Sequence, residues 1–264
     1  MNEPLARFDA EGLPVGVYDD RQAMAVAAAG HTADILRSCV SATGAARVVI
    51  ATGNSQLAFV AALREEQVPW EKVTVFHMDE YVGIDDRHPA SFRRWIREHV
   101  EEPFAPARVC YIDGDAADPE AECARYEVLL REAPLDLVCL GIGENGHLAF
   151  NEPYDADRDD PRWARVITLT PASRHQQVGE GHFAGFDAVP ATAITLTVPA
   201  LLGARHVQAV VPEARKARAV QRALRGEVGA HCPATWLRGQ AGARLFLDRE
   251  SAALVMDEPV VSGG

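Results

Sequence analysis

Long apolar runs, a positive charge balance and paired cysteines are all missing from this sequence of 264 residues. No run approaches the roughly 20 apolar residues that span a membrane, so we expect no transmembrane helix. The 38 acidic residues outnumber the 26 basic ones, which gives a formal net charge of −12. Such a surface repels phosphate backbones and anionic lipids, and we expect no binding to nucleic acid or membranes. The negative net charge does not exclude a small anionic ligand, because a local cluster of hydrogen-bond donors can outweigh it.

The five cysteines are scattered, and none belongs to a CxxC pair. This pattern is typical of reduced thiols in a cytosol and argues against zinc. The GxSxG, P-loop and HExxH motifs are also absent, so we expect no metal site. The first residues, MNEPLARFDAEG, contain no basic segment leading into an apolar one. We therefore expect no secretory signal and a cytoplasmic protein.

The sequence does contain short apolar, β-branched runs that alternate with stretches of helical periodicity. The runs cover residues 47–51, 73–77, 135–140, 166–169, 194–198 and 207–211, and the helical stretches cover 20–39, 55–66, 91–100, 119–132 and 213–225. Strands that alternate with helices of this length predict βαβ crossovers and a parallel sheet. No linker or repeat divides the chain. We therefore expect residues 1–264 to form a single α/β domain, whose doubly wound, mainly parallel sheet has helices on both faces (Rossmann-like).

The first candidate site is the turn 52–55 (TGNS), which follows a predicted strand and opens a predicted helix. In a doubly wound sheet, ligands bind at the carboxyl ends of the strands. Gly53 permits a tight turn, Ser55 can cap the helix and Thr52 adds a hydroxyl. Because the exposed N–H groups of a helix start bind phosphate well, we interpret the turn as a possible anion site. An ordinary βα turn with a serine cap is an equal alternative.

The second candidate lies in the segment 78–81 (MDEY) at the end of another predicted strand. Side chains alternate along a strand, so Asp79 shares a face with His77 while Glu80 points the other way. The two acids are therefore poorly placed for a paired-carboxylate mechanism. Asp79 alone is well placed as a general base, and a solvated strand-end acid or a helix cap is the alternative.

The third candidate is the segment 141–153 (GIGENGHLAFNEP), whose glycines follow the GxGxxG pattern. A dinucleotide-binding fingerprint would open a long helix and be followed by an acid about 20 residues on, whereas the NEP at the end of this segment breaks the pattern. The glycines therefore favour close approach of the backbone to some other ligand. His147 could move a proton near neutral pH, and Glu152 could orient or charge it. A purely structural histidine is the alternative.

The fourth candidate is the basic segment 215–218 (RKAR) in the first turns of a predicted helix. Cations at a helix N-terminus oppose the macrodipole by roughly 0.3–1 kcal/mol each. A bound anion would relieve this conflict, which makes Lys216 a phosphate-binding candidate. A solvated basic face is the alternative.

Several of these segments resemble the signature blocks of glucosamine-6-phosphate deaminases, which are also called isomerases. The strongest similarity lies in residues 76–92 (FHMDEYVGIDDRHPASF) and 141–153. The order and spacing of ATGNS, AITLTVPALL and Lys216 also match, so the resemblance covers roughly residues 15–250. The wider superfamily includes 6-phosphogluconolactonases and the sugar-sensing domains of some repressors.

The resemblance implies a cofactor-free conversion of glucosamine 6-phosphate to fructose 6-phosphate and ammonia. Asp79 falls at the position of the base that moves a proton between C2 and C1. His147 falls at the position of the ring-opening acid and base, and Glu152 at that of its acidic partner. The implied catalytic residues are thus Asp79, Asn145, His147 and Glu152, and the implied substrate-binding residues are Thr52, Gly53, Asn54, Ser55, Gly146 and Lys216.

The sequence departs from the family pattern at four places. Asn145 stands where many members have an aspartate, and the turn TGNSQ lacks the usual Gly, Thr and Pro after its first glycine. Gly179 occupies the position of an arginine that clamps phosphate, and Ile167 that of a lysine in the allosteric site of regulated members. We expect no allosteric control of that kind. The candidates for replacing the arginine are Arg174, Gln176 and Gln177.

The leading hypothesis is an isomerase and deaminase acting on an amino-sugar phosphate, a small-molecule partner, with a homo-oligomer possible. A 6-phosphogluconolactonase-like hydrolase is disfavoured, because those proteins typically continue after the Gly-His turn with a Ser-Leu-Phe-Pro type of segment, where this chain has AFNEP. A sugar-phosphate-binding protein with weakened catalysis is a third reading, prompted by Asn145 and Gly179. Repressors of that kind need a separate DNA-binding domain, and because the strand pattern begins early in this sequence we expect none.

Overall fold

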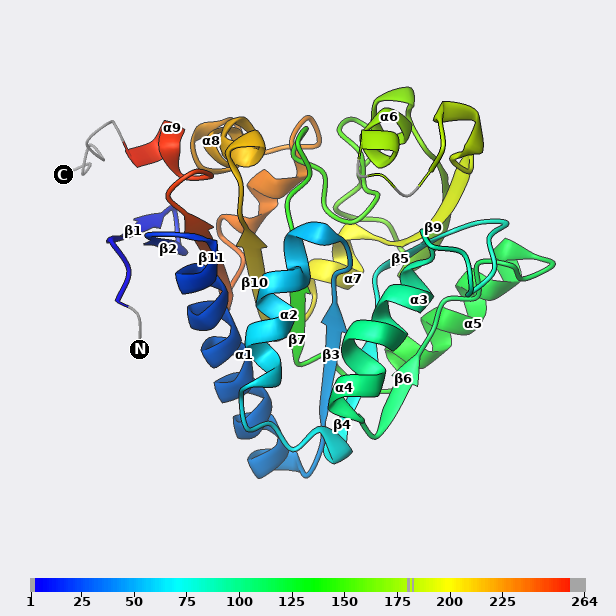
Figure 1. Cartoon of the computed structure of the whole chain (residues 1–264), viewed down its shortest axis with the longest axis horizontal. Coiled ribbons are helices and arrows are strands. Elements are labelled where there is room, and N and C mark those ends of the chain that lie inside the picture. Colours follow the sequence, from blue (N-terminus) through cyan, green and yellow to red (C-terminus); the bar gives the residue numbers. More distant parts are fainter. Residues whose placement is uncertain (1–2, 180, 182, 257–264) are drawn as a thin grey trace.

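An eight-stranded, mainly parallel sheet forms the centre of the molecule (Figure 1). The computed structural model describes residues 3–179, 181 and 183–256. In spatial order the strands are β1 (Ala6–Ala10), β2 (Leu13–Tyr18), β11 (Ala243–Asp248), β10 (His206–Val211), β7 (Leu137–Leu140), β3 (Ala46–Ile50), β4 (Val73–Phe76) and β6 (Arg108–Cys110). All neighbouring pairs from β2 to β6 are parallel, and only β1 runs antiparallel to its neighbour. The predicted parallel α/β sheet is confirmed.

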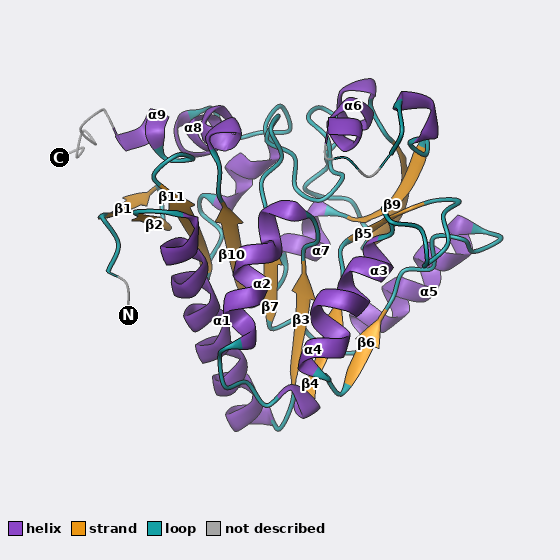
Figure 2. Cartoon of the chain, in the orientation of Figure 1, coloured by secondary structure: helices purple, strands orange, loops and turns teal. Residues whose placement is uncertain are grey.

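Helices cover both faces of this sheet, as predicted (Figure 2). The α-helices of the described residues are α1 (Arg21–Thr43), α2 (Leu57–Arg64), α3 (Phe92–Ile96), α4 (Glu102–Phe104), α5 (Pro119–Arg131), α6 (Pro171–Gly179), α7 (Val198–Leu202), α8 (Ala217–Arg225) and α9 (Ala253–Met256), and α6 lies beyond the carboxyl ends of the strands (Figure 1). On β3, Val48 and Ile50 pack into the layer of α1 and α2, whereas Val49 packs into the layer of α5, α7 and α8. Because successive residues of a strand face opposite sides, these apolar runs bury both faces. No helix in the described part of the chain is long and apolar enough to cross a membrane.

Helix α1 begins where the predicted stretch 20–39 begins but continues to Thr43, and local capping signals mark both of its ends. The Asp20 side chain accepts a hydrogen bond from the backbone N–H of Ala23, which caps the first turn. Gly44 ends the helix at a φ of 84°, and its N–H donates to the carbonyl oxygen of Val40. Glycine adopts this left-handed conformation at no steric cost.

Two predicted strands form a separate antiparallel sheet instead of joining the parallel one. This second sheet has the order β5 (Asp79–Tyr81), β9 (Thr192–Leu196) and β8 (Ala164–Thr168). The runs 166–169 and 194–198 therefore pair with each other. Which strands become neighbours depends on contacts between residues far apart in the chain, and the local pattern does not show these contacts. Strand β5 follows β4 almost directly, so this sheet extends from the carboxyl ends of the parallel strands.

Candidate active site

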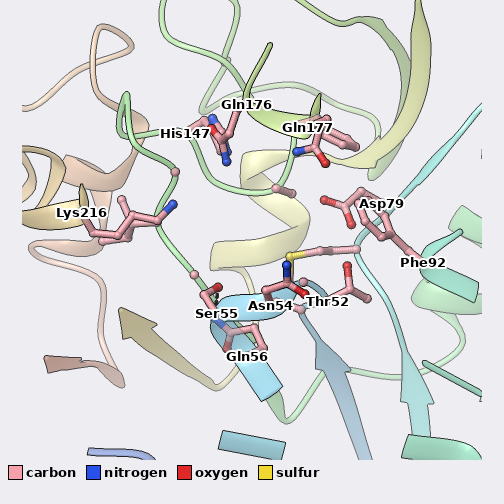
Figure 3. A pocket seen from close by; sticks show the side chains of 18 of the residues that line it. Thr52, Asn54, Ser55, Gln56, Asp79, Phe92, His147, Gln176, Gln177 and Lys216 are labelled. Atoms are coloured by element: carbon pink, nitrogen blue, oxygen red, sulfur yellow. Dashed lines mark hydrogen bonds between the residues drawn. The ribbon is translucent and has the colours of Figure 1, made fainter. Parts of the chain in front are cut away.

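A pocket opens at the carboxyl ends of β3, β4, β7 and β10, between these strands and α6 (Figure 3). Each of the four turns singled out in the sequence contributes residues to its lining. Parallel strands place their carboxyl ends at one edge of the sheet, which is why segments more than 150 residues apart meet here. Phe92, Phe150 and Arg215, to which the sequence analysis assigned no role of their own, also line the pocket.

The turn that carries Thr52, Gly53, Asn54 and Ser55 forms one wall of the pocket. Gly53 has a φ of 100°, in the region that favours glycine. The chain continues as a 3₁₀ turn, Asn54–Gln56, before α2. Ser55 does not cap the helix as expected: its hydroxyl accepts a hydrogen bond from Gln56 Nε2 at 3.2 Å, and no side chain caps either the 3₁₀ turn or α2. The N–H groups at this helix start therefore suit an anionic ligand.

Lys216 lies at the start of α8, and its side chain reaches toward the pocket from the side opposite Asp79 (Figure 3). Only 6% of its surface is exposed. The neighbouring Arg215 also lines the pocket, and its guanidinium forms an ion pair with Glu144 at 3.0 Å. Lys216 therefore brings a buried cationic side chain to this end of the pocket, whereas the charge of Arg215 is balanced by Glu144.

Asp79 lines the other end of the pocket and is almost completely buried. Burial, reinforced by the charge of Glu80, raises the pKa of the Asp79 carboxyl to about 8. A carboxyl with that pKa can take up and release protons near neutral pH, which an ordinary aspartate cannot do.

Glu80 points away from the pocket, as the alternation along the strand predicts. Its carboxylate accepts hydrogen bonds from the Ser91 hydroxyl at 2.8 Å and from the backbone N–H groups of Phe92 at 3.1 Å and Arg93 at 2.8 Å. These groups belong to the first turn of α3, where a negative charge is favourable. Glu80 thus anchors α3, while Asp79 faces the pocket.

His147 lines the pocket, and Glu152 lies behind it. His147 Nδ1 is 3.5 Å from Glu152 Oε1. The ring packs so closely on Gly143 that a Cβ at that position would overlap it. Glu152 is buried and does not belong to the pocket lining, whereas His147 contacts both the pocket and Glu152.

Asn145 forms hydrogen bonds with both His147 and Glu152. Its Nδ2 donates to Glu152 Oε2 at 2.6 Å, and its Oδ1 accepts from the backbone N–H of His147 at 3.1 Å. The Ser173 hydroxyl donates to the other oxygen of Glu152. Both carboxylate oxygens of Glu152 therefore accept hydrogen bonds, which fix the orientation of the carboxylate beside His147.

The structure places two further predicted residues away from the pocket lining. Gly146 has a φ of 92°, and a Cβ there would press on Cys232, so its position reflects the turn and close packing. Arg174 lies across the ring of Phe186, with its guanidinium carbon 3.9 Å from the ring centroid, and donates to the carbonyl oxygens of Phe186 and Val189. Of the candidates for the missing arginine, Gln176 and Gln177 line the pocket and Arg174 does not.

The sequence analysis assigned no role to two neighbours of Asp79 that lie in the same sequence block. His77 and Tyr81 are both fully buried. Tyr81 donates a hydrogen bond to Gln177 Oε1 at 2.5 Å. The period-two alternation already places Tyr81 on the same face as Asp79, but its partner 96 residues away has no local signal.

No group of His, Cys, Asp and Glu side chains in the described ranges could hold a metal ion.

Comparison with known proteins identifies the family. Residues 19–246 match the family described as glucosamine-6-phosphate isomerases/6-phosphogluconolactonase, and the chain belongs to this family. A glucosamine-6-phosphate deaminase from Exiguobacterium sibiricum is 35% identical over 223 residues, which are 81% of this chain and 83% of the relative. The family resemblance seen in the sequence is thereby confirmed.

Solved structures show the same architecture. A monomeric glucosamine-6-phosphate deaminase superposes with a TM-score of 0.83 at 28% identity, over 91% of this chain and 99% of that one. The 6-phosphogluconolactonase from Leishmania guyanensis gives a TM-score of 0.74 at 18% identity, over 91% and 98% of the two chains. The second likeness shows a shared fold.

Proposed function

We propose that this chain converts glucosamine 6-phosphate and water to fructose 6-phosphate and ammonia. The observation that carries the proposal is the placement of Asp79, a buried carboxyl whose pKa is raised to about 8, at one end of a pocket. His147 and Glu152 supply a proton-transfer pair in the same pocket. The name of the Exiguobacterium relative and the family match support the same reaction.

The proposed reaction begins with opening of the sugar ring. His147 moves the proton between the ring oxygen and the C1 hydroxyl, and Glu152 orients the imidazole and stabilises its charged form. Opening exposes an aldehyde at C1, which acidifies the hydrogen on C2.

Asp79 then takes the proton from C2 and returns it to C1. The enolamine formed in between becomes a C2 imine, and water adds to this imine and releases ammonia, which leaves the C2 ketone of fructose 6-phosphate. One water is consumed and one ammonia is formed, so the reaction balances without a redox cofactor. The pocket contributes to this step by holding Asp79 close to both C1 and C2.

The phosphate of the substrate is proposed to bind at the turn 52–55 and Lys216. Backbone N–H groups at a helix start and a buried ammonium are a suitable pair for a phosphate dianion. Asp79 lies on the opposite side of the pocket from Lys216 (Figure 3), so a sugar bound through its phosphate at Lys216 would extend toward Asp79 and His147. The proposed substrate also suits a cytoplasmic enzyme, and the five cysteines, all free thiols, support a reducing compartment.

The test compares three compounds with one enzyme preparation: glucosamine 6-phosphate, unphosphorylated glucosamine and 6-phosphogluconolactone. Ammonia and fructose 6-phosphate are measured in separate assays, and lactone loss is measured by acid release. Equal amounts of ammonia and fructose 6-phosphate from the phosphorylated sugar, with far less from glucosamine, are expected. Lactone hydrolysis without deamination would assign the hydrolase function instead, and tight binding of the sugar phosphate without turnover would indicate a sensor.

A further inference from the structure

Gln177 and Asp79 both line the pocket, and Figure 3 shows their side chains on the same side of it, opposite Lys216. Asp79 and Tyr81 are two residues apart on β5, so their side chains leave the strand on the same face. The Tyr81 hydroxyl donates to Gln177 Oε1 at 2.5 Å. Strand β5 therefore places both the candidate base and the group that holds this amide.

The contact with Tyr81 determines which end of the amide faces a ligand. Gln177 Oε1 is occupied by the tyrosine hydroxyl, so Nε2 is the end available to the pocket. Of the residues that the structure describes, none accepts a hydrogen bond from Gln177 Nε2, and none donates one to the Asp79 carboxylate. The Nε2 donor of Gln177 and the carboxylate acceptor of Asp79 are therefore both available to a ligand in the pocket.

The position of Tyr81 is fixed by aromatic packing. Its ring is fully buried, and its centroid lies 5.0 Å from that of Phe92 and 5.7 Å from that of Phe150. Phe92 and Phe150 also line the pocket. The hydroxyl has little freedom to move, so the amide that it holds is preorganised for recognition.

We propose that Gln177, oriented by Tyr81, is a specificity-determining residue that donates a hydrogen bond to the C3 hydroxyl oxygen of the sugar. This inference rests on the proposed function, in which Asp79 takes the proton from C2. His147 serves the oxygen atoms at C1 and in the ring, so C3 carries the remaining polar group next to the reacting carbon. A sugar without that hydroxyl would leave the buried amide without an acceptor, which is costly.

The test measures binding, so that it does not depend on turnover. The probes are the non-reacting sugar alcohol 2-amino-2-deoxyglucitol 6-phosphate and its 3-deoxy form, and Kd is obtained by calorimetry. The proteins are the wild type, Gln177→Leu, Tyr81→Phe and the control Gln22→Leu, which alters an exposed position on α1. Tyr81→Phe removes only the orienting hydroxyl and keeps the aromatic packing, so it serves as the second variant if Gln177→Leu unfolds.

We expect the wild type and the control to bind the 3-deoxy probe about 10- to 100-fold more weakly than the full probe. Gln177→Leu should bind both probes with the same weak Kd, and Tyr81→Phe should show a reduced difference between them. An equal loss of affinity for both probes in Gln177→Leu, with the full wild-type ratio preserved, would overturn the inference. Selective binding by a wild type that releases no ammonia would instead refute the proposed function and leave this inference standing.

Discussion

His77 Nδ1 lies 2.9 Å from the backbone carbonyl oxygen of Asp79, and this contact is a hydrogen bond donated by the histidine. The direction follows from the other ring nitrogen: Nε2 accepts from the backbone N–H of Ile112 at 2.9 Å, so the proton must be on Nδ1. Burial lowers the pKa of His77 to about 3, which keeps the ring neutral. The imidazole thus connects the chain after β6 to the residue that carries the proposed base.

Replacing this imidazole should separate stability from catalysis. In His77→Leu, the carbonyl of Asp79 and the N–H of Ile112 both lose their buried partner, so the free energy of unfolding should fall by about 1–3 kcal/mol. Asp79 should also lose its fixed position, and we expect kcat to fall at least about 10-fold while KM changes less. Urea unfolding and steady-state kinetics check the two effects. A destabilised variant with unchanged kcat would show that the ring supports only the fold.

The pH dependence of the reaction should report the ionisation of Asp79. Because the base works as a carboxylate and its pKa is about 8, kcat/KM should rise as the pH increases and level off above about pH 8. A profile of kcat/KM from pH 6 to 9.5 checks this expectation. A profile that is already level at pH 6 would mean that Asp79 is ionised throughout and that burial does not control it.

The raised pKa of Asp79 also predicts that its ionised carboxylate lowers the stability of the folded protein. Folded Asp79 has a pKa of about 8, against 3.8 for an ordinary aspartate, so between these values the unfolded chain releases a proton that the folded protein still holds. The contribution of Asp79 to stability is therefore greatest below about pH 4 and is lost as the pH rises to about 8. The side chain of Asp79→Asn cannot ionise, so the variant avoids this loss in the free energy of unfolding, which is at most about 6 kcal/mol.

Urea unfolding of the wild type and Asp79→Asn at pH 5, 7 and 9 measures the effect. The variant should be the more stable protein, and its advantage should grow with pH. An advantage that is constant over this range would contradict the assigned ionisation.

The contact between Gly143 and the His147 ring gives a direct test of the proton-transfer pair. Gly143 has an ordinary φ, but a Cβ there would overlap the imidazole, so Gly143→Ala must displace the ring from Glu152. General acid–base catalysis typically contributes about 100- to 10,000-fold, and we expect a loss of at least about 100-fold in kcat. The matched control is Gly185→Ala, where a Cβ meets nothing within 4 Å. Equal activity of the two variants would exclude His147 from the chemistry.

Local signals account for much of the fold and for the parts of the site that lie on single turns. Asp20 and Gly44 mark the ends of α1 because capping depends only on neighbouring residues. The four turns meet because the sheet is parallel, a property that follows from the βαβ pattern. The alternation along one strand separates Asp79 from Glu80.

The missed features depend on contacts between distant residues. The pairing of β8 with β9, and the bond from Tyr81 to Gln177, join segments that no local pattern connects. The capping role expected for Ser55 was wrong because a 3₁₀ turn precedes α2 and takes Ser55 out of the capping position, whereas its expected role in substrate binding stays a prediction. The assignment of His147, Glu152 and Lys216 to the reaction remains a prediction that the geometry makes coherent.

The most direct test of the central claim, that Asp79 is the base, is ammonia release from glucosamine 6-phosphate by the wild type and Asp79→Asn at pH 8. The asparagine keeps the shape of the side chain but cannot accept the C2 proton. We predict rapid release by the wild type and at least a 1,000-fold lower kcat for the variant, on the order expected for the loss of a general base. Binding of the sugar alcohol 2-amino-2-deoxyglucitol 6-phosphate should persist in the variant. Ammonia release at the wild-type rate by Asp79→Asn would contradict the account.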